Sequence, residues 1–222
     1  MESGSRRSSD SMTAAMWLDV FNQNPYATNC WLLSAEGSND AVVVDPGFEP
    51  QVLHAMLDTA GKTPVAVLAT HAHVDHMGAG GDFAGELPVF VHEADSVAFT
   101  NEPAWNAGFA NPLAPVKDIR MIADGDVLRF GGLSIEVVHT PGHTPGHCCF
   151  RVDGEVALLA GDLVFAGSIG RSDFPNSDPG AMQRSLRRFL SLPDPVPVLP
   201  GHGPDTTVGR ERASNPFLQE LG

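Results

Sequence analysis

The sequence predicts an α/β fold in which two β-sheets pack face to face and helices cover the outside. Apolar segments follow the order strands, helix, strand, helix twice along the chain, without a strict repeat. The length of 222 residues suits one domain, and the 42% of hydrophobic residues can fill a substantial core. Several apolar segments end in histidine or aspartate, so polar side chains are expected where strands end.

The first half of the chain carries the clearest periodic signals. Residues 1–12 are polar and rich in serine and are predicted to be a disordered lead-in, which leaves residues 13–222 for the single domain. Strands are expected at residues 14–21, 29–34, 41–44 and 65–69. Residues 49–60 have apolar side chains at helical spacing, and Gly61 ends this helix.

The rest of the chain alternates short elements with turns. A short helix, a strand at residues 89–91 and a helical segment at 93–99 precede a proline-containing loop or cap at 101–117. Strands follow at residues 127–130, 133–138, 148–152 and 156–160, and their close spacing favours antiparallel pairing. An amphipathic helix at 178–192, a strand at 196–199 and a terminal helix from about Val208 complete the domain.

Composition argues against several functions. The 27 acidic and 13 basic residues give a net charge of −14, which disfavours nucleic-acid binding because that needs a basic face. The 3 cysteines, of which two are adjacent, predict no disulfide framework and suit a reducing compartment. No run resembles a signal peptide or reaches the roughly 18–20 apolar residues of a membrane span. We therefore expect a cytoplasmic protein without a membrane partner, as a monomer or a small homo-oligomer.

The run Thr70-His71-Ala72-His73-Val74-Asp75-His76 is the most informative feature of the sequence. Imidazole and carboxylate together are ligands for Zn, Fe or Mn. In an extended segment, His71 and His73 point to the same face and can share one ion. Asp75 and His76 follow after the chain turns, so they can address a second position.

Further candidate ligands follow downstream at His143, Asp162 and His202. Each lies at or just after the end of an apolar segment, as a shared pocket at strand ends requires. Seven ligands are more than one tetrahedral ion uses, so the set predicts two metals and a hydrolytic reaction.

Four segments together resemble the metallo-β-lactamase superfamily, and within it the glyoxalase II-like thioesterases, or hydroxyacylglutathione hydrolases. They are the run His71–His76, the segment Thr140-Pro141-Gly142-His143-Thr144-Pro145-Gly146, the pair Gly161-Asp162 and the turn Gly201-His202. The resemblance implies the αββα sandwich of that superfamily. It places His71, His73 and His143 on a first metal and Asp75, His76 and His202 on a second, with Asp162 bridging the two.

The same resemblance implies a metal-dependent hydrolase that cleaves a thioester such as S-lactoylglutathione. Two divalent ions, zinc in the first place and iron or manganese as alternatives, would share a hydroxide that attacks the carbonyl. Asp75 would orient this hydroxide and accept its proton as the catalytic carboxylate. The substrate would be a small acyl-thiol, and the thiol is left open between glutathione and another small thiol.

Three points stay open. A persulfide dioxygenase has a similar ligand list but uses a single Fe(II), here on His71, His143 and Asp162; a lactonase or phosphodiesterase shares the scaffold. Arg171, in a Gly-Arg-Ser-Asp-Phe segment, would either bind a substrate carboxylate, orient its loop or pair with Asp173. His139 and His147, on either side of His143, would support ligands through hydrogen bonds or simply pack in the core.

Overall fold

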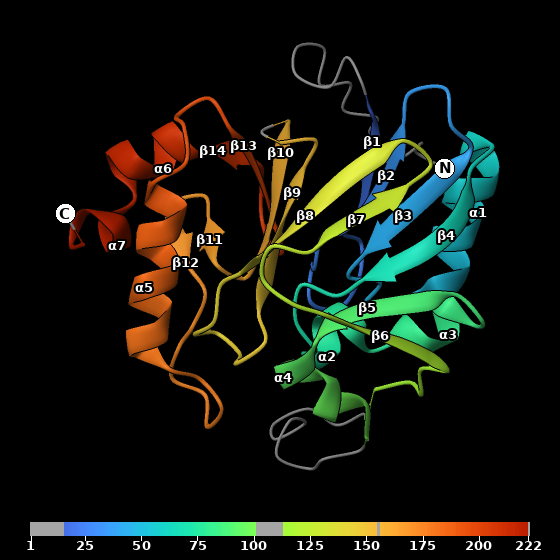
Figure 1. The fold of residues 1–222 in the computed structure, drawn as a ribbon, viewed down its shortest axis with the longest axis horizontal. Coiled ribbons are helices and arrows are strands. Elements are labelled where there is room, and N and C mark those ends of the chain that lie inside the picture. Colours follow the sequence, from blue (N-terminus) through green and yellow to red (C-terminus); the bar gives the residue numbers. More distant parts are fainter. Residues whose placement is uncertain (1–15, 101–112, 155, 222) are drawn as a thin grey trace.

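A computed structural model describes residues 16–100, 113–154 and 156–221 and contains two six-stranded sheets packed face to face (Figure 1). The first sheet has the order β1 (Met16–Phe21), β2 (Cys30–Ala35), β3 (Asp40–Val44), β4 (Thr63–Leu68), β5 (Pro88–His92) and β6 (Asp118–Ile122). The second has the order β14 (Thr206–Thr207), β13 (Pro197–Pro200), β10 (Ala157–Gly161), β9 (Cys148–Val152), β8 (Leu133–His139) and β7 (Val127–Phe130). The strands β11 (Val164–Phe165) and β12 (Ser168–Ile169) form a separate hairpin.

Helices cover both outer faces, as Figure 1 shows. Those of the first half are α1 (Pro50–Ala60), α2 (Val74–Met77), α3 (Gly80–Ala84), α4 (Glu93–Ser96) and the 3-10 turn η1 (Val97–Thr100). Those of the second half are α5 (Pro179–Leu190), α6 (Val208–Ser214) and α7 (Pro216–Gln219). Among the described residues, no helix has the length and hydropathy needed to cross a bilayer.

The period-two pattern of the strands divides the apolar side chains among three core layers. On β2, Trp31 and Leu33 belong to the cluster between the sheets, whereas Cys30 and Leu32 pack with the side chains of α1 and α3. On β10, Leu159 faces the first sheet, and Leu158 belongs to the cluster under α5. The arrangement is the predicted one of two packed sheets with helices outside.

Most predicted elements in the described ranges are confirmed. Strands β7 to β10 pair antiparallel in succession, and α1 ends at Gly61, whose φ of 66° is left-handed. Strand β6 was not predicted: it is a short edge strand in which the charged Asp118 and Arg120 alternate with Ile119 and Met121. The predicted lead-in at residues 1–12 and most of the loop at 101–117 lie outside the described residues.

The topology places four chain segments at one edge of the sandwich. Strand β4, which pairs parallel with β3, ends at Leu68. In the other sheet, β10 ends at Gly161, and β13 runs parallel to β10 and ends at Pro200. The segment after β8 is tied to the segment after β4, because the Cys148 amide donates to the Thr70 carbonyl over 2.7 Å. The polar residues that follow these strands therefore meet.

Candidate metal centre

The structure brings all seven sequence-predicted ligands into one cluster at this edge. Their ligand atoms form three groups, within each of which the atoms lie no more than 4.8 Å apart: a first group of His71, His73 and His143; a second group of Asp75, His76 and His202; and a third group of His71, His76 and Asp162. The first and second groups are the sets that the resemblance assigned to two different ions. Asp162 lies between them.

Contacts inside the cluster are close. Nδ1 of His73 lies 2.9 Å from Nε2 of His143. The two oxygens of Asp162 face different groups, since Oδ2 is 3.5 Å from Nε2 of His143 and Oδ1 is 3.2 Å from Nε2 of His76. Nε2 of His202 lies 3.2 Å from Oδ2 of Asp75. A bridging carboxylate with one three-histidine group on one side and a mixed group on the other suits two ions.

Buried polar atoms without hydrogen bonds provide a test of whether a metal fits here. Within the described part of the chain, Nε2 of His71, Nε2 of His76 and Oδ1 of Asp162 are buried and make no hydrogen bond, and the last two lie 3.2 Å apart as an ion pair. An unpartnered buried polar group costs about 1–3 kcal/mol. All three atoms point into the same cluster and are ligand types for Zn or Fe, so a divalent ion fits the donor set.

Charge differs between the two sides of the cluster. Burial and the neighbouring imidazoles hold the pKa of His71 well below its usual range, and burial lowers the pKa of His73 to about 3. Burial lowers the pKa of His143 as well, so the first group offers neutral imidazoles to an ion. Burial also disfavours the charged form of His76, but the carboxylates of Asp162, Asp75 and Asp45 raise its pKa well above its usual range. The second group thus holds positive charge where an ion would otherwise sit.

A buried aspartate that sequence reasoning did not single out orients two of the histidines. Asp45, directly after β3, accepts hydrogen bonds from the Thr70 amide at 2.8 Å, from the Thr70 hydroxyl at 2.7 Å and from Nδ1 of His76 at 2.9 Å. Because the Thr70 hydroxyl donates its proton to Asp45, the hydroxyl oxygen accepts a hydrogen bond from Nδ1 of His71 at 3.0 Å. Asp45 therefore holds both imidazoles with Nδ1 protonated and Nε2 available to an ion.

His147 and His139, on either side of His143, differ in their contacts. Nε2 of His147 accepts a hydrogen bond from the Asp162 amide at 3.0 Å, and its Nδ1 lies 2.8 Å from the Thr140 hydroxyl. This is the supporting role that was left open for it. His139 instead stacks on His92, with ring centroids 4.0 Å apart.

Arg171 lies beside the cluster and contributes its main chain. Its carbonyl accepts from Nδ1 of His143 at 2.7 Å, which fixes that imidazole with Nε2 toward the other ligands. Its guanidinium pairs with Asp173 through Nε at 2.8 Å and Nη2 at 3.0 Å, as one of the alternatives expected. It also lies over the ring of Phe174, which in turn packs 5.4 Å from the ring of His73.

Gly201 explains how the last ligand reaches the cluster. A Cβ at this position would lie 2.4 Å from Oδ1 of Asp162 and 2.6 Å from Cε1 of His76. Only a residue without a side chain allows β13 to end against these two ligands. The Gly-His order at the end of this strand is thus a steric requirement.

A family model described as the metallo-beta-lactamase superfamily matches residues 24–202. The chain belongs to this superfamily. The match includes all seven clustered residues, and it confirms the predicted metallo-β-lactamase type of αββα sandwich.

Three relatives of this superfamily member show the range of its neighbours. Hydroxyacylglutathione hydrolase GloC of Haemophilus influenzae is 34% identical over 91% of this chain and 98% of its own length. The crystal structure of the B3 metallo-beta-lactamase BLEG-1 superposes with a TM-score of 0.83 at 32% identity, covering 91% of this chain and 99% of that one. The structure of TTHA1623 in a di-iron-bound form has a TM-score of 0.80 at 39% identity, covering 90% of this chain and 100% of that one.

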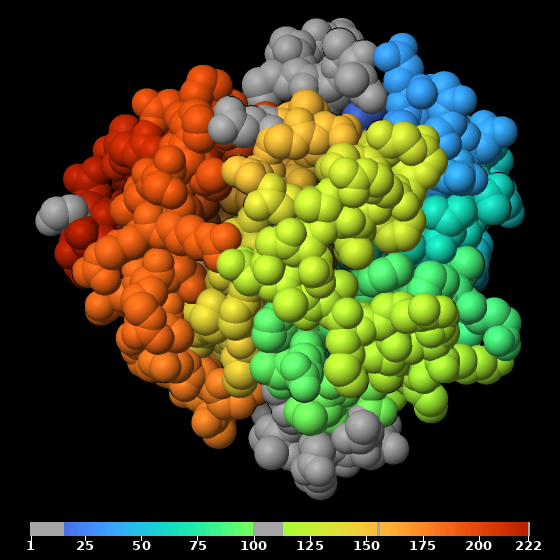
Figure 2. Space-filling view, viewed as in Figure 1, coloured from blue at the N-terminus to red at the C-terminus, as the bar shows by residue number. Residues whose placement is uncertain are grey.

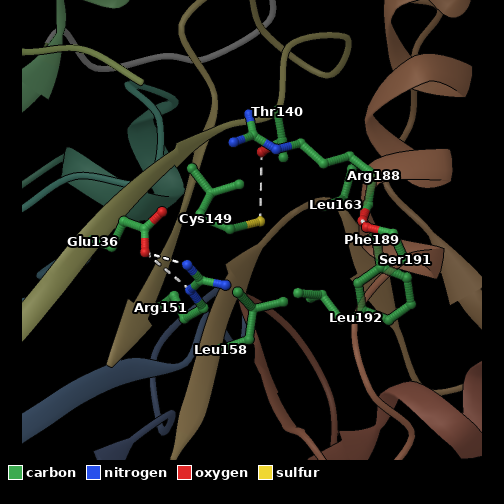
Figure 3. A pocket seen from close by; sticks show the side chains of 11 residues that line it. Glu136, Thr140, Cys149, Arg151, Leu158, Leu163, Arg188, Phe189, Ser191 and Leu192 are labelled. Carbon is green, nitrogen blue, oxygen red and sulfur yellow. Dashed lines mark hydrogen bonds and ion pairs between the residues drawn. The ribbon is translucent and has the colours of Figure 1, made fainter. Parts of the chain in front are cut away.

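A cavity of about 140 Å³ lies apart from the metal-ligand cluster of this superfamily member (Figure 3). It opens between α5 and the outer face of β8, β9 and β10, where the orange and yellow segments meet in Figure 2. Its walls carry leucines, Phe189 and the Arg151–Glu136 ion pair, and none of the seven clustered residues. The chemistry is therefore placed at the cluster and not in this cavity.

Proposed function

We propose that the protein is a metal-dependent hydrolase that cleaves the thioester of a small acyl-thiol, such as S-lactoylglutathione. The observation that carries this proposal is the convergence of seven histidine and aspartate side chains at the ends of four segments. Three of their ligand atoms, on His71, His76 and Asp162, are buried without a hydrogen bond. The similarity to GloC supports the thioester as the bond that is cleaved.

His71, His73 and His143 would hold one ion, Asp75, His76 and His202 would hold the other, and Asp162 would contact both. Two bound divalent ions would supply the Lewis acidity that lowers the pKa of water toward about 7 and polarises the thioester carbonyl. Asp45 and the Arg171 carbonyl keep three imidazoles in the tautomer that presents Nε2 to the cluster.

Asp75 is the residue that we assign to proton transfer. Its side chain is 14% exposed and is the more accessible of the two clustered carboxylates. Burial opposes its ionisation, but the charge of His76 and the hydrogen bond of His202 hold the pKa of Asp75 below its usual range, so it is an acceptor at neutral pH. The thiolate that leaves is the base of an acid with a pKa of about 8.5 and departs without a dedicated proton donor.

Arg171 is the residue that we propose for substrate contact. Its side chain is 66% exposed beside the cluster, and Asp173 occupies only its Nε and Nη2. A carboxylate of the thiol would bind the remaining Nη1, while Phe174 offers an apolar surface next to His73.

A mononuclear Fe(II) persulfide dioxygenase is the second candidate. It would use His71, His143 and Asp162, which lie together in the cluster, and TTHA1623 shows that a relative's site holds iron. The two candidates differ in the number of ions and in the need for oxygen.

One experiment tests the hydrolase and separates it from the dioxygenase. Three quantities are measured on the same purified protein: its metal content, its rate of S-lactoylglutathione hydrolysis and its oxygen uptake with glutathione persulfide. We expect hydrolysis that disappears when the metals are removed and in His73→Ala, but persists in His54→Ala, which changes an exposed histidine stacked on Phe83. Full hydrolysis by metal-free protein or by His73→Ala would contradict the proposal.

A further inference from the structure

Asp95 in α4 belongs to none of the three metal-binding groups, yet it connects the segments that supply the first group. Its side chain is fully buried. Oδ1 accepts from the Gly146 amide at 2.5 Å, and Oδ2 accepts from the Thr144 hydroxyl at 2.7 Å and from the Ala72 amide at 3.1 Å. Ala72 lies between His71 and His73, and Thr144 follows His143, so one carboxylate holds both segments.

The packing around this carboxylate leaves little freedom. A Cβ at Gly146 would lie 2.5 Å from Oδ1 of Asp95 and 2.7 Å from its Cγ. The segment after β8 therefore approaches Asp95 as closely as a glycine backbone allows. A change in the carboxylate would alter the separation between the segment of His71 and that of His143.

The second group is held by other contacts. Nδ1 of His76 donates to Asp45 at 2.9 Å. His202 follows Gly201, whose carbonyl accepts from the Asn29 amide at 2.7 Å. None of these bonds involves Asp95, so its removal should affect the two groups unequally.

We propose that Asp95 is a positioning residue for one of two ions. It keeps His71, His73 and His143 at the separation that a single ion requires, while the ligands of the other ion do not depend on it. This inference rests on the proposed two-ion centre, and it concerns metal affinity rather than turnover.

The test is a titration of metal-free protein with Zn²⁺ in competition with a chromophoric chelator, which measures two dissociation constants without any substrate. Asp95→Asn keeps the size of the side chain but turns an amide NH₂ toward at least one of its backbone donors. We expect one dissociation constant to rise about 10- to 100-fold and the other to stay within about twofold. The same titration in a His202→Ala background, which lacks a second-group ligand, assigns the weakened step to the first group.

Glu211 in α6 provides a matched control. It is also buried and accepts three hydrogen bonds, from the Thr206 hydroxyl at 2.6 Å, the Gly167 amide at 2.8 Å and Nδ2 of Asn215 at 2.9 Å. None of these donors adjoins a clustered residue in the chain. Glu211→Gln should lower the stability of the fold as Asp95→Asn does, and should leave both dissociation constants unchanged.

The outcomes separate this inference from the proposed function. Equal weakening of both steps, no weakening, or the same pattern in Glu211→Gln would overturn the role of Asp95. A wild-type protein that binds only one ion would count against the proposed two-ion hydrolase. Even then, weaker binding of that ion in Asp95→Asn than in Glu211→Gln would support the positioning role.

Discussion

Substitution of Asp45 by asparagine should change the tautomers of two histidines at once. In the structure, Oδ2 of Asp45 accepts both from Nδ1 of His76 and from the Thr70 hydroxyl. If the new carboxamide keeps its oxygen on the Thr70 amide, its NH₂ group faces these two atoms instead. His76 must then accept on Nδ1. The Thr70 hydroxyl accepts from the carboxamide and donates to Nδ1 of His71.

Both imidazoles would therefore carry their proton on Nε2, the atom that the cluster needs as a ligand. Loss of a supporting hydrogen bond to a metal ligand costs 10- to 100-fold in metal affinity, or about 1.4–2.7 kcal/mol. The proposal assigns His71 and His76 to different ions, so we expect each of the two ions to bind about 10- to 100-fold more weakly in Asp45→Asn. The fold should persist, because the altered tautomers restore the hydrogen bonds.

Two measurements check this reasoning. Competition titration with Zn²⁺ gives the two dissociation constants. Long-range ¹⁵N–¹H spectra report the tautomer of His71, whose lowered pKa keeps its ring neutral in the metal-free protein. Thr70→Val removes the hydroxyl that links Asp45 to His71 but keeps the hydrogen bond between Asp45 and His76, so it should weaken the binding of one ion. Asp58→Asn removes an exposed acid of α1 and should weaken the binding of neither ion. Wild-type affinity for both ions in Asp45→Asn, or a neutral His71 that keeps its proton on Nδ1 in that variant, would refute the account.

Three further predictions follow from the structure. Arg171→Met should raise the KM for S-lactoylglutathione about 3- to 10-fold at unchanged kcat, because the carbonyl that holds His143 remains; an equal fall in kcat would contradict this. Gly201→Ala should weaken the binding of one ion more than about tenfold in a metal titration, since the new Cβ would lie 2.4 Å from Oδ1 of Asp162. Burial raises the pKa of Asp95 from 3.8 to about 6, so the folded metal-free protein binds this proton more tightly than the unfolded chain does. The wild-type protein should therefore lose about 2 kcal/mol of unfolding free energy, relative to Asp95→Asn, between about pH 4 and pH 6. Urea denaturation of the two metal-free proteins measures this difference. A rise over the same pH range would contradict the raised pKa of Asp95.

The sequence was sufficient to predict the parts of the molecule that depend on local pattern. Alternation of apolar residues located most strands, and histidine or aspartate at the ends of four segments located the cluster. The run His71–His76 can supply ligands to two positions because the chain is extended through His73 and becomes helical from Val74. The pair His71 and His73 is therefore directed differently from the pair Asp75 and His76.

The supporting residues could not be found in the same way. Asp45 reads as part of an Asp-Pro-Gly turn, and only the parallel pairing of β3 with β4 brings it beside Thr70. Asp95 lies in a short helix whose sequence resembles any exposed turn, although its carboxylate is buried against Gly146. Each acts through contacts between distant segments, which no local pattern records.

The proposed function requires that this cluster hold two ions when the protein hydrolyses a thioester. The most direct measurement is the number of metal ions bound per chain in the active protein, determined while S-lactoylglutathione hydrolysis is followed under anaerobic conditions. We predict two ions per chain and hydrolysis that needs no oxygen. A single iron per chain, with no hydrolysis and with oxygen consumed in the presence of glutathione persulfide, would contradict the claim and establish the dioxygenase instead.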